Sequence, residues 1–150
     1  KVFDDRFVVL LREGHPATRR LSLATYLALD HTVVTPRGRP GSIIDDCLAQ
    51  LGAGRRRDVL RLPHFVSAAL LVSRTDLVVT APSAFAHAMT RLAPLTVSPL
   101  PFDVPDFTFS MIFGAHTARD PGQRWFRDKL ADALREGLPP QTPRRRGPRR

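Results

Sequence analysis

A chain of 150 residues, 43% of them apolar and with a net charge of +9, is long enough for one compact unit or two small lobes. No uncharged apolar run approaches the roughly 20 residues that cross a membrane, which argues against a spanning helix. The single cysteine, Cys47, excludes an intrachain disulfide and favours a reducing, cytoplasmic location.

Short apolar runs alternate with helix signals along the chain. In chain order, the first half predicts a strand over Phe7–Leu11, a short helix capped by Ser22, a strand over 31–35 and a helix capped by Ser42. The second half first predicts a strand over Val59–Leu62, a helix from His64 or Phe65 to about Ser73 and a strand over Leu77–Ala81. It then predicts a helix starting at Pro82-Ser83, an aromatic strand over 107–113 and a helix from Asp120 to about Glu136. Strands alternating with helices at this spacing indicate an α/β sandwich with mostly parallel strands.

The last of these helices has an apolar face that we expect to pack in a core. Its members are Trp125, Phe126, Lys129, Leu130, Ala133 and Leu134. By contrast, the start of the chain, KVFDDRF, has neither an initiator methionine nor the apolar region of a signal peptide, and we interpret it as part of a longer protein.

Charged residues outside the helices are interpreted as structural or solvated. Five arginines in the closing PRRRGPRR supply more than half of the net charge, and we expect residues 139–150 to be disordered. Non-specific contact of this tail with nucleic-acid phosphates is the alternative. Arg55–Arg57 is predicted to be a solvated loop, and Asp4/Asp5 a solvated turn or a helix N-terminal charge. We expect Asp76 to accept hydrogen bonds from free backbone amides at the end of a helix.

Two histidines stand out against this background. In an α/β unit the helix N-termini gather at the carboxyl edge of the sheet, where their free amides favour an anion. His64 is predicted to begin such a helix, directly after a strand. His31 begins its own strand, and we expect the two imidazoles to face one shared crevice. A core or capping role is the simpler alternative for each of them.

Several phrases together resemble a known family. GHPATRRLSLATYLALDHTVV, GSIIDDCLAQLG, PHFVSAALLVSRTDLVVTAPSAFA, PLPFDVPDF and RDPGQRWFR, which follow one another between Phe3 and Glu136, resemble the effector-binding domain of LysR-type transcriptional regulators. The resemblance is strongest to the branch of nodulation and aromatic-catabolism regulators.

The resemblance implies a type 2 periplasmic-binding-protein-like α/β fold of two lobes with a cleft, of which only the later part is present. Residues 1–11 would end lobe I and form the first crossover, 12–100 would form lobe II, and 101–138 would cross back to lobe I. The winged helix-turn-helix that binds promoter DNA would precede this chain. The resemblance also implies a homodimer or homotetramer.

Effectors of this family bind between the two lobes, so the resemblance implies which residues of this chain would contact the effector. The effector-binding candidates are His31, Gly38, His64, Phe65 and Phe113. The histidines would donate hydrogen bonds to a carboxylate or phenolic oxygen, and the phenylalanines would stack on a ring. Relatives in this branch typically have Trp-His where this chain has Phe113-Gly114, so the effector need not be the same.

The sequence favours binding over catalysis. The five histidines and Cys47 show no zinc-ligand spacing, and no nucleophile–base pair is evident, so we expect no metal, no cofactor and no enzymatic activity. A small, aromatic and anionic metabolite is the expected effector. A periplasmic-type solute-binding protein or an enzyme with the same fold is the alternative, as is a nucleic-acid module built on the arginine tail.

Overall fold

The computed structural model describes residues 1–35 and 42–138, so Gly38 and the terminal tail lie outside the described residues. The chain divides into two compact units. The larger comprises Asp4–Phe107, and the smaller comprises Lys1–Phe3 together with the chain from Thr108 onward.

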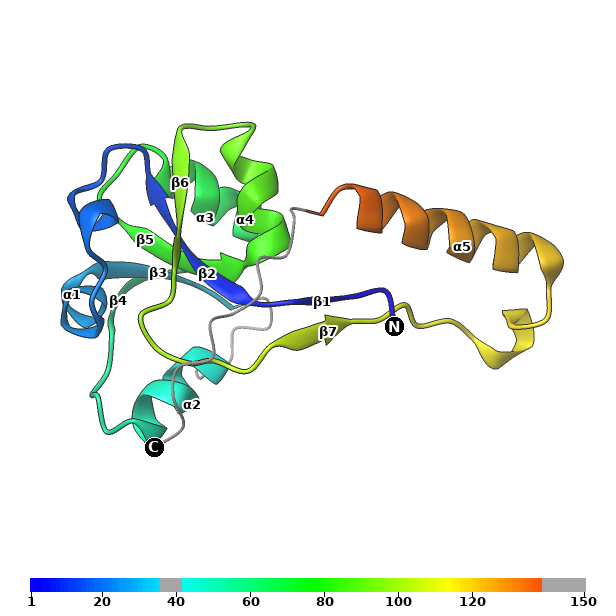
Figure 1. The fold of residues 1–150 in the computed structure, drawn as a ribbon, viewed down its shortest axis with the longest axis horizontal. Coiled ribbons are helices and arrows are strands. Elements are labelled where there is room, and N and C mark those ends of the chain that lie inside the picture. The colour runs from blue at the N-terminus through cyan, green and yellow to red at the C-terminus, as the bar shows by residue number, and fades with distance from the viewer. Residues whose placement is uncertain (36–41, 139–150) are drawn as a thin grey trace. The chain divides into compact units, whose positions relative to one another are not determined.

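The larger unit contains a five-stranded mixed sheet with the strand order β4-β3-β5-β2-β6 (Figure 1). Its strands are β2 (Phe7–Arg12), β3 (Asp30–Val34), β4 (Arg57–Leu62), β5 (Val78–Pro82) and β6 (Leu95–Pro99). β3 is parallel to β4 and β5, whereas β2 is antiparallel to β5 and β6. The prediction of mostly parallel strands is therefore wrong for half of the pairings, because an apolar run does not indicate which way its strand points.

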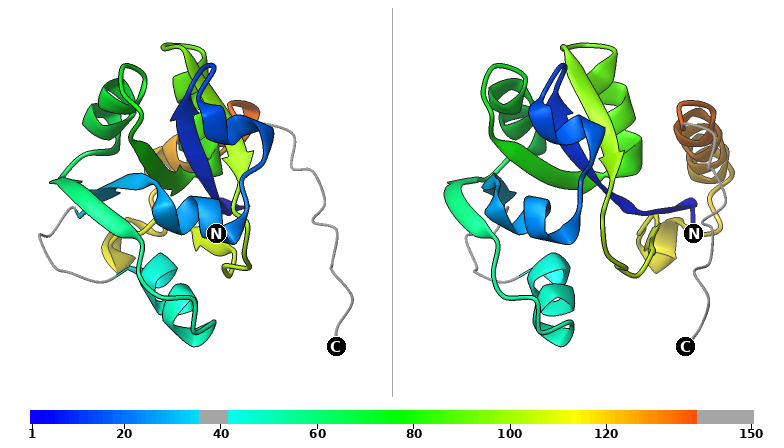
Figure 2. Two further views of the ribbon diagram at one scale, coloured as in Figure 1. Left: turned by 90° about the vertical axis from the view of Figure 1, so that its left-hand side faces the viewer. Right: turned by 60° about the vertical axis from the view of Figure 1, so that its left-hand side comes forward.

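Helices cover both faces of this sheet, as the sandwich prediction required (Figure 2). The helical segments of the unit are η1 (Pro16–Arg19), α1 (Leu23–Ala28), α2 (Ile43–Gln50), α3 (Phe65–Val72) and α4 (Ser83–Thr90). The interior strand β2 serves both layers, since Val9 and Leu11 pack with α1 and α2 while Val8 and Leu10 pack with α3 and α4. Each layer thus has its own apolar core.

Local signals placed the helices correctly. Ser22 and Ser42 accept hydrogen bonds from the amides of Thr25 and Asp45, which makes them the predicted N-caps of α1 and α2. Gly52 follows α2 with a φ of 61°, a left-handed conformation that glycine adopts without steric cost.

Two strands differ from the prediction. β6 was not predicted, because its prolines and its short length resemble a connection; it is an edge strand, where proline is tolerated. β7 covers only Phe107–Phe109 instead of 107–113, and it pairs with β1 (Phe3–Asp5) in a two-stranded sheet.

The smaller unit consists mainly of η2 (Ala115–Thr117) and α5 (Pro121–Glu136). Asp120 caps α5 as predicted, accepting a 2.6 Å hydrogen bond from the amide of Gln123. The expected core packing of this helix is wrong in the present chain, because Trp125 is 64% exposed and Phe126 57% exposed. Near the other end of α5, the Arg135 guanidinium donates to the carbonyl of Val2.

Candidate functional site

The carboxyl ends of the parallel strands β3, β4 and β5 lie at one edge of the sheet, and α2, α3 and α4 begin there (Figure 1). The amide of Thr35 donates to the carbonyl of Leu62, so β3 and β4 stay paired up to this edge. Three helix N-termini are therefore gathered where the sequence predicts an anion-binding edge.

The first turn of α2 is occupied by groups of the chain itself. The Ser42 hydroxyl donates to Asp45 Oδ2 at 2.8 Å and accepts from the Asp45 amide. Arg56 completes the arrangement, because its guanidinium donates to Ser42 Oγ and lies 3.0 Å from Asp45 Oδ1.

Arg56 corrects the prediction of a solvated arginine loop. Its side chain is only 3% exposed and also lies 3.2 Å from Asp58 on β4. The adjacent Arg57 is part of β4 and forms an exposed ion pair with Asp30. Arg56 thus ties α2 to the sheet from inside the unit.

The first turn of α4 is also occupied. Asp5 is buried, and its carboxylate accepts from the amide of Ala84 at 3.2 Å and from the amide of Arg6 at 2.8 Å. The Ser83 amide donates to the carbonyl of Arg6. Of the two alternatives for the Asp4/Asp5 pair, Asp5 is therefore a helix N-terminal charge rather than part of a solvated turn, and it caps a helix 79 positions away.

The first turn of α3 differs from the other two. His64 is its N-cap residue and is exposed, and it makes no capping hydrogen bond. Within the described ranges, no acceptor meets the amides of Phe65, Val66 and Ser67, and the turn carries no acidic residue. The Phe65 ring lies 5.5 Å from that of Phe85, which holds an apolar surface beside these amides. Among the described residues, α3 is thus the helix start of this edge that has no side-chain cap.

His31 lies elsewhere and is fully buried. It pairs in register with Asp58, whereas His64 follows Leu62, the register partner of Val34 at the far end of β3. The structure therefore does not bring the two imidazoles together. The His31 ring packs edge-on against Tyr26, and its Nε2 donates to the Tyr26 carbonyl at 2.6 Å. The role of His31 as an effector ligand stays a prediction.

The protonation of His31 is disfavoured by its surroundings. Burial, aided by the charge of Arg56, lowers the pKa of His31 below its ordinary value of 6.5, although the hydrogen bond to Tyr26 opposes this. Its Nδ1 is buried without a partner among the described groups, so a proton added there would find no acceptor.

We expect acid to destabilise the fold through His31. Below about pH 6.5 the unfolded chain takes up a proton that the folded His31 refuses, so the free energy of unfolding falls as the pH falls, by at most about 1.4 kcal/mol per unit for this group. Urea unfolding between pH 7.5 and 5 measures this slope. His31→Gln keeps a donor for Tyr26 and should flatten the slope; an unchanged slope would mean that other groups cause it.

Phe113 belongs to the smaller unit and is 50% exposed. The Arg127 guanidinium lies 4.2 Å from the centre of its ring, a cation–π contact. Beside it, a Cβ added at Gly114 would lie 2.6 Å from the imidazole of His116. The His116 ring therefore occupies the space in which a side chain at position 114 would begin.

His15 and Asp76 support the turn after β2. His15 Nδ1 accepts from the amide of Ala17 and Nε2 contacts the Asp76 carbonyl, so this histidine has a structural role. The Asp76 carboxylate pairs with Arg12 at 2.7 Å rather than with backbone amides. The amide of Leu77 is instead satisfied by the hydroxyl of Thr75.

The described part of the chain contains no helix that could span a membrane. Within the same residues, no three His, Cys, Asp or Glu side chains are grouped in a way that could hold a metal ion.

Comparison with known families identifies the fold. The model of the LysR substrate binding domain matches residues 1–135. The chain belongs to this family. The LysR-type substrate-binding domain described here is 30% identical over 137 residues to the HTH-type transcriptional activator NagR of a Ralstonia species, a match that covers 91% of this chain and 45% of NagR. The domain thus spans less than half of that relative.

Solved structures agree with this assignment. The regulatory domain of MexT, a transcriptional activator in Pseudomonas aeruginosa, superimposes with a TM-score of 0.76 at 27% identity, over 87% of this chain and 64% of that one. The BenM effector-binding domain with its effector benzoate matches with a TM-score of 0.56 at 12% identity, over 93% of this chain and 64% of that one, which shows the fold alone. The predicted fold class, α/β of the type 2 periplasmic-binding-protein-like kind, is confirmed.

Sequence reasoning missed Asp5 and Arg56. Neighbouring acids at the start of a chain and a run of three arginines are typical of solvated turns, and nothing local distinguishes their buried members.

Proposed function

We propose that this LysR-type domain senses a small anionic metabolite in a cytoplasmic transcriptional regulator, and that the anionic group of the effector binds at the first turn of α3. The observation that carries this is the contrast among three helices at one edge. Ser42 caps α2 and Asp5 caps α4, whereas no side chain of the described residues caps α3.

The chemistry of the α3 turn suits an organic acid. Free amides at a helix N-terminus donate to an anion, and the positive end of the helix dipole adds to the attraction. His64 stands at the N-cap as a further donor, and the half-buried ring of Phe65 offers a face for an apolar or aromatic body. Effector contacts by His31, Gly38 and Phe113 stay predictions, and the proposal for the α3 turn does not depend on them.

The proposal does not require catalysis. A serine–histidine contact does occur, with Ser83 Oγ 3.3 Å from His87 Nδ1, but the same nitrogen lies 2.8 Å from the Ser83 carbonyl. Nδ1 must carry its proton to donate to that carbonyl, so it cannot act as a base toward the hydroxyl. Effector binding would instead shift the geometry of an oligomer and its DNA-binding domains.

The α3 turn is tested with paired ligands and point variants. Calorimetry of the protein with benzoate, shikimate and the uncharged benzamide should show binding of at least one acid and weaker binding of the amide. His64→Ala, and Val66→Pro, which removes one first-turn amide where proline is tolerated, should each weaken acid binding about tenfold. His87→Ala on α4 is the matched control.

Two results would contradict the proposal at different points. Acid binding that both variants leave unchanged would reject the α3 turn as the site. Absence of binding by any organic acid in a broad screen, together with promoter occupancy that no small molecule alters, would reject the sensing function.

A further inference from the structure

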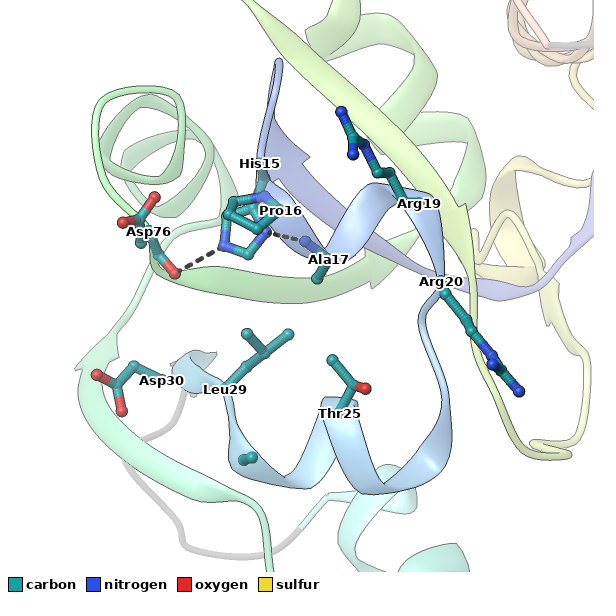
Figure 3. A pocket seen from close by; sticks show the side chains of 10 residues that line it. His15, Pro16, Ala17, Arg19, Arg20, Thr25, Leu29, Asp30 and Asp76 are labelled. Carbon is teal, nitrogen blue, oxygen red and sulfur yellow. Dashed lines mark hydrogen bonds between the residues drawn. The ribbon is translucent and has the colours of Figure 1, made fainter.

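The larger unit contains a hollow at the edge of the sheet opposite to the α3 turn. It has a volume of about 500 Å³ and lies between η1 and α1. Asp30, the first residue of β3, and Asp76, which precedes β5, line one end of it (Figure 3). The hollow therefore lies at the amino ends of two strands whose carboxyl ends meet α2 and α4.

The middle of this hollow is apolar. Leu29 and Thr25 of the α1 segment point across it toward Ala17 and His15 of the η1 segment (Figure 3). His15 holds its wall in place through hydrogen bonds to the Ala17 amide and the Asp76 carbonyl. The opposite wall is fixed by the Ser22–Thr25 cap of α1. A preformed apolar hollow of this size suits a small organic molecule.

The charges at its two ends are not equivalent. The acidic end is neutralised, because Asp76 pairs with Arg12 at 2.7 Å and Asp30 pairs with Arg57 at 3.0 Å. Arg19 and Arg20 lie at the other end, and neither has an acidic partner among the described residues. Both are exposed, and their guanidinium groups extend outward from the rim (Figure 3).

We propose that this hollow is a second ligand site, which binds a small organic carboxylate with an apolar body. The body would lie against Ala17, Ala28 and Leu29, and the carboxylate would meet Arg19 and Arg20, whose exposed side chains change rotamer readily. A cationic ligand is disfavoured, since the two carboxylates already have partners. The site stands apart from the α3 turn and does not rest on the function proposed for it.

The test compares ligands of one shape and different charge. Phenylacetate, phenylacetamide and phenethylamine are titrated into a His64→Ala/Val66→Pro variant, so that binding at the α3 turn does not contribute. NMR shifts of the Ala17, Ala28 and Leu29 methyl groups report on the hollow. Phenylacetate should shift them and bind about tenfold more tightly than the other two ligands, with a preference that weakens as salt is added.

Variants separate charge from shape. Arg19→Gln/Arg20→Gln should remove the preference for phenylacetate over phenylacetamide, whereas Arg55→Gln/Arg91→Gln, which removes the same charge elsewhere, should retain it. Ala28→Trp should fill the hollow from an exposed position and abolish the shifts for all ligands. Methyl groups that no ligand shifts, or a preference that survives loss of Arg19 and Arg20, would overturn the proposal.

Discussion

Replacing Arg56 by methionine is expected to lower the free energy of unfolding by about 2–3 kcal/mol and the melting temperature by about 8 °C. Methionine fills a similar space but leaves Asp45 and Asp58 without their shared cation, and the two carboxylates are only 33% and 24% exposed. This partial exposure keeps the effect below that of a fully buried pair. Chemical denaturation followed by circular dichroism measures the loss.

The two adjacent arginines provide the controls. Arg55→Met removes an exposed side chain, and Arg57→Met removes one partner of an exposed ion pair, so each should change stability by about 0.5 kcal/mol or less. Asp45→Asn combined with Arg56→Met should recover part of the loss, because one of the stranded charges is gone. Equal stability of the Arg55 and Arg56 variants would disprove the internal role of Arg56.

Replacing Phe126 and Leu130 by lysine is expected to reduce self-association of the 150-residue chain severalfold. These residues are 57% and 38% exposed on α5, beside Trp125 and Leu134, which are also exposed. An apolar helix face in contact with water favours association with other apolar surfaces. Sedimentation and binding of an apolar dye measure the change. Gln123→Lys/Gly137→Lys adds the same charge at exposed positions and should leave association unchanged.

In a longer protein we expect the same pair of lysines to lower the stability of the fold. The chain spans 45% of NagR and 64% of the MexT regulatory domain, so a protein of their length has further chain available to cover α5. Burying lysines there would lower the melting temperature. A short chain that stays monomeric with or without the lysines would show that this face does not drive association.

The elements that the sequence predicted well are those governed by short-range chemistry. The caps Ser22, Ser42 and Asp120 each bond an amide three residues ahead, so the signal and its partner lie in one short window. The apolar runs of β2 and β5 are buried on both faces, and they were predicted within a residue or two of their bounds.

The candidate site was predicted only in part. The sequence placed His64 at the start of a helix at the carboxyl edge, and the structure confirms that position. It did not indicate which of the three helix starts lacks a side-chain cap. That depends on Asp5, which reaches the first turn of α4 from a distant part of the chain, and on Arg56, which pairs with Asp45 in the first turn of α2.

The sequence by itself determined the α/β architecture and the order of the helices, because hydrophobic period and capping act over a few residues. The family followed from the resemblance of several phrases of the sequence. The tertiary structure alone decided that β2 runs antiparallel to β5 and β6, and that Asp5 and Arg56 are buried. It also decided that His31 lies at the start of β3, whereas His64 follows β4 at the opposite edge of the sheet. These features depend on which segments distant in the sequence meet, and side-chain burial and pairing are properties of that meeting rather than of any local pattern.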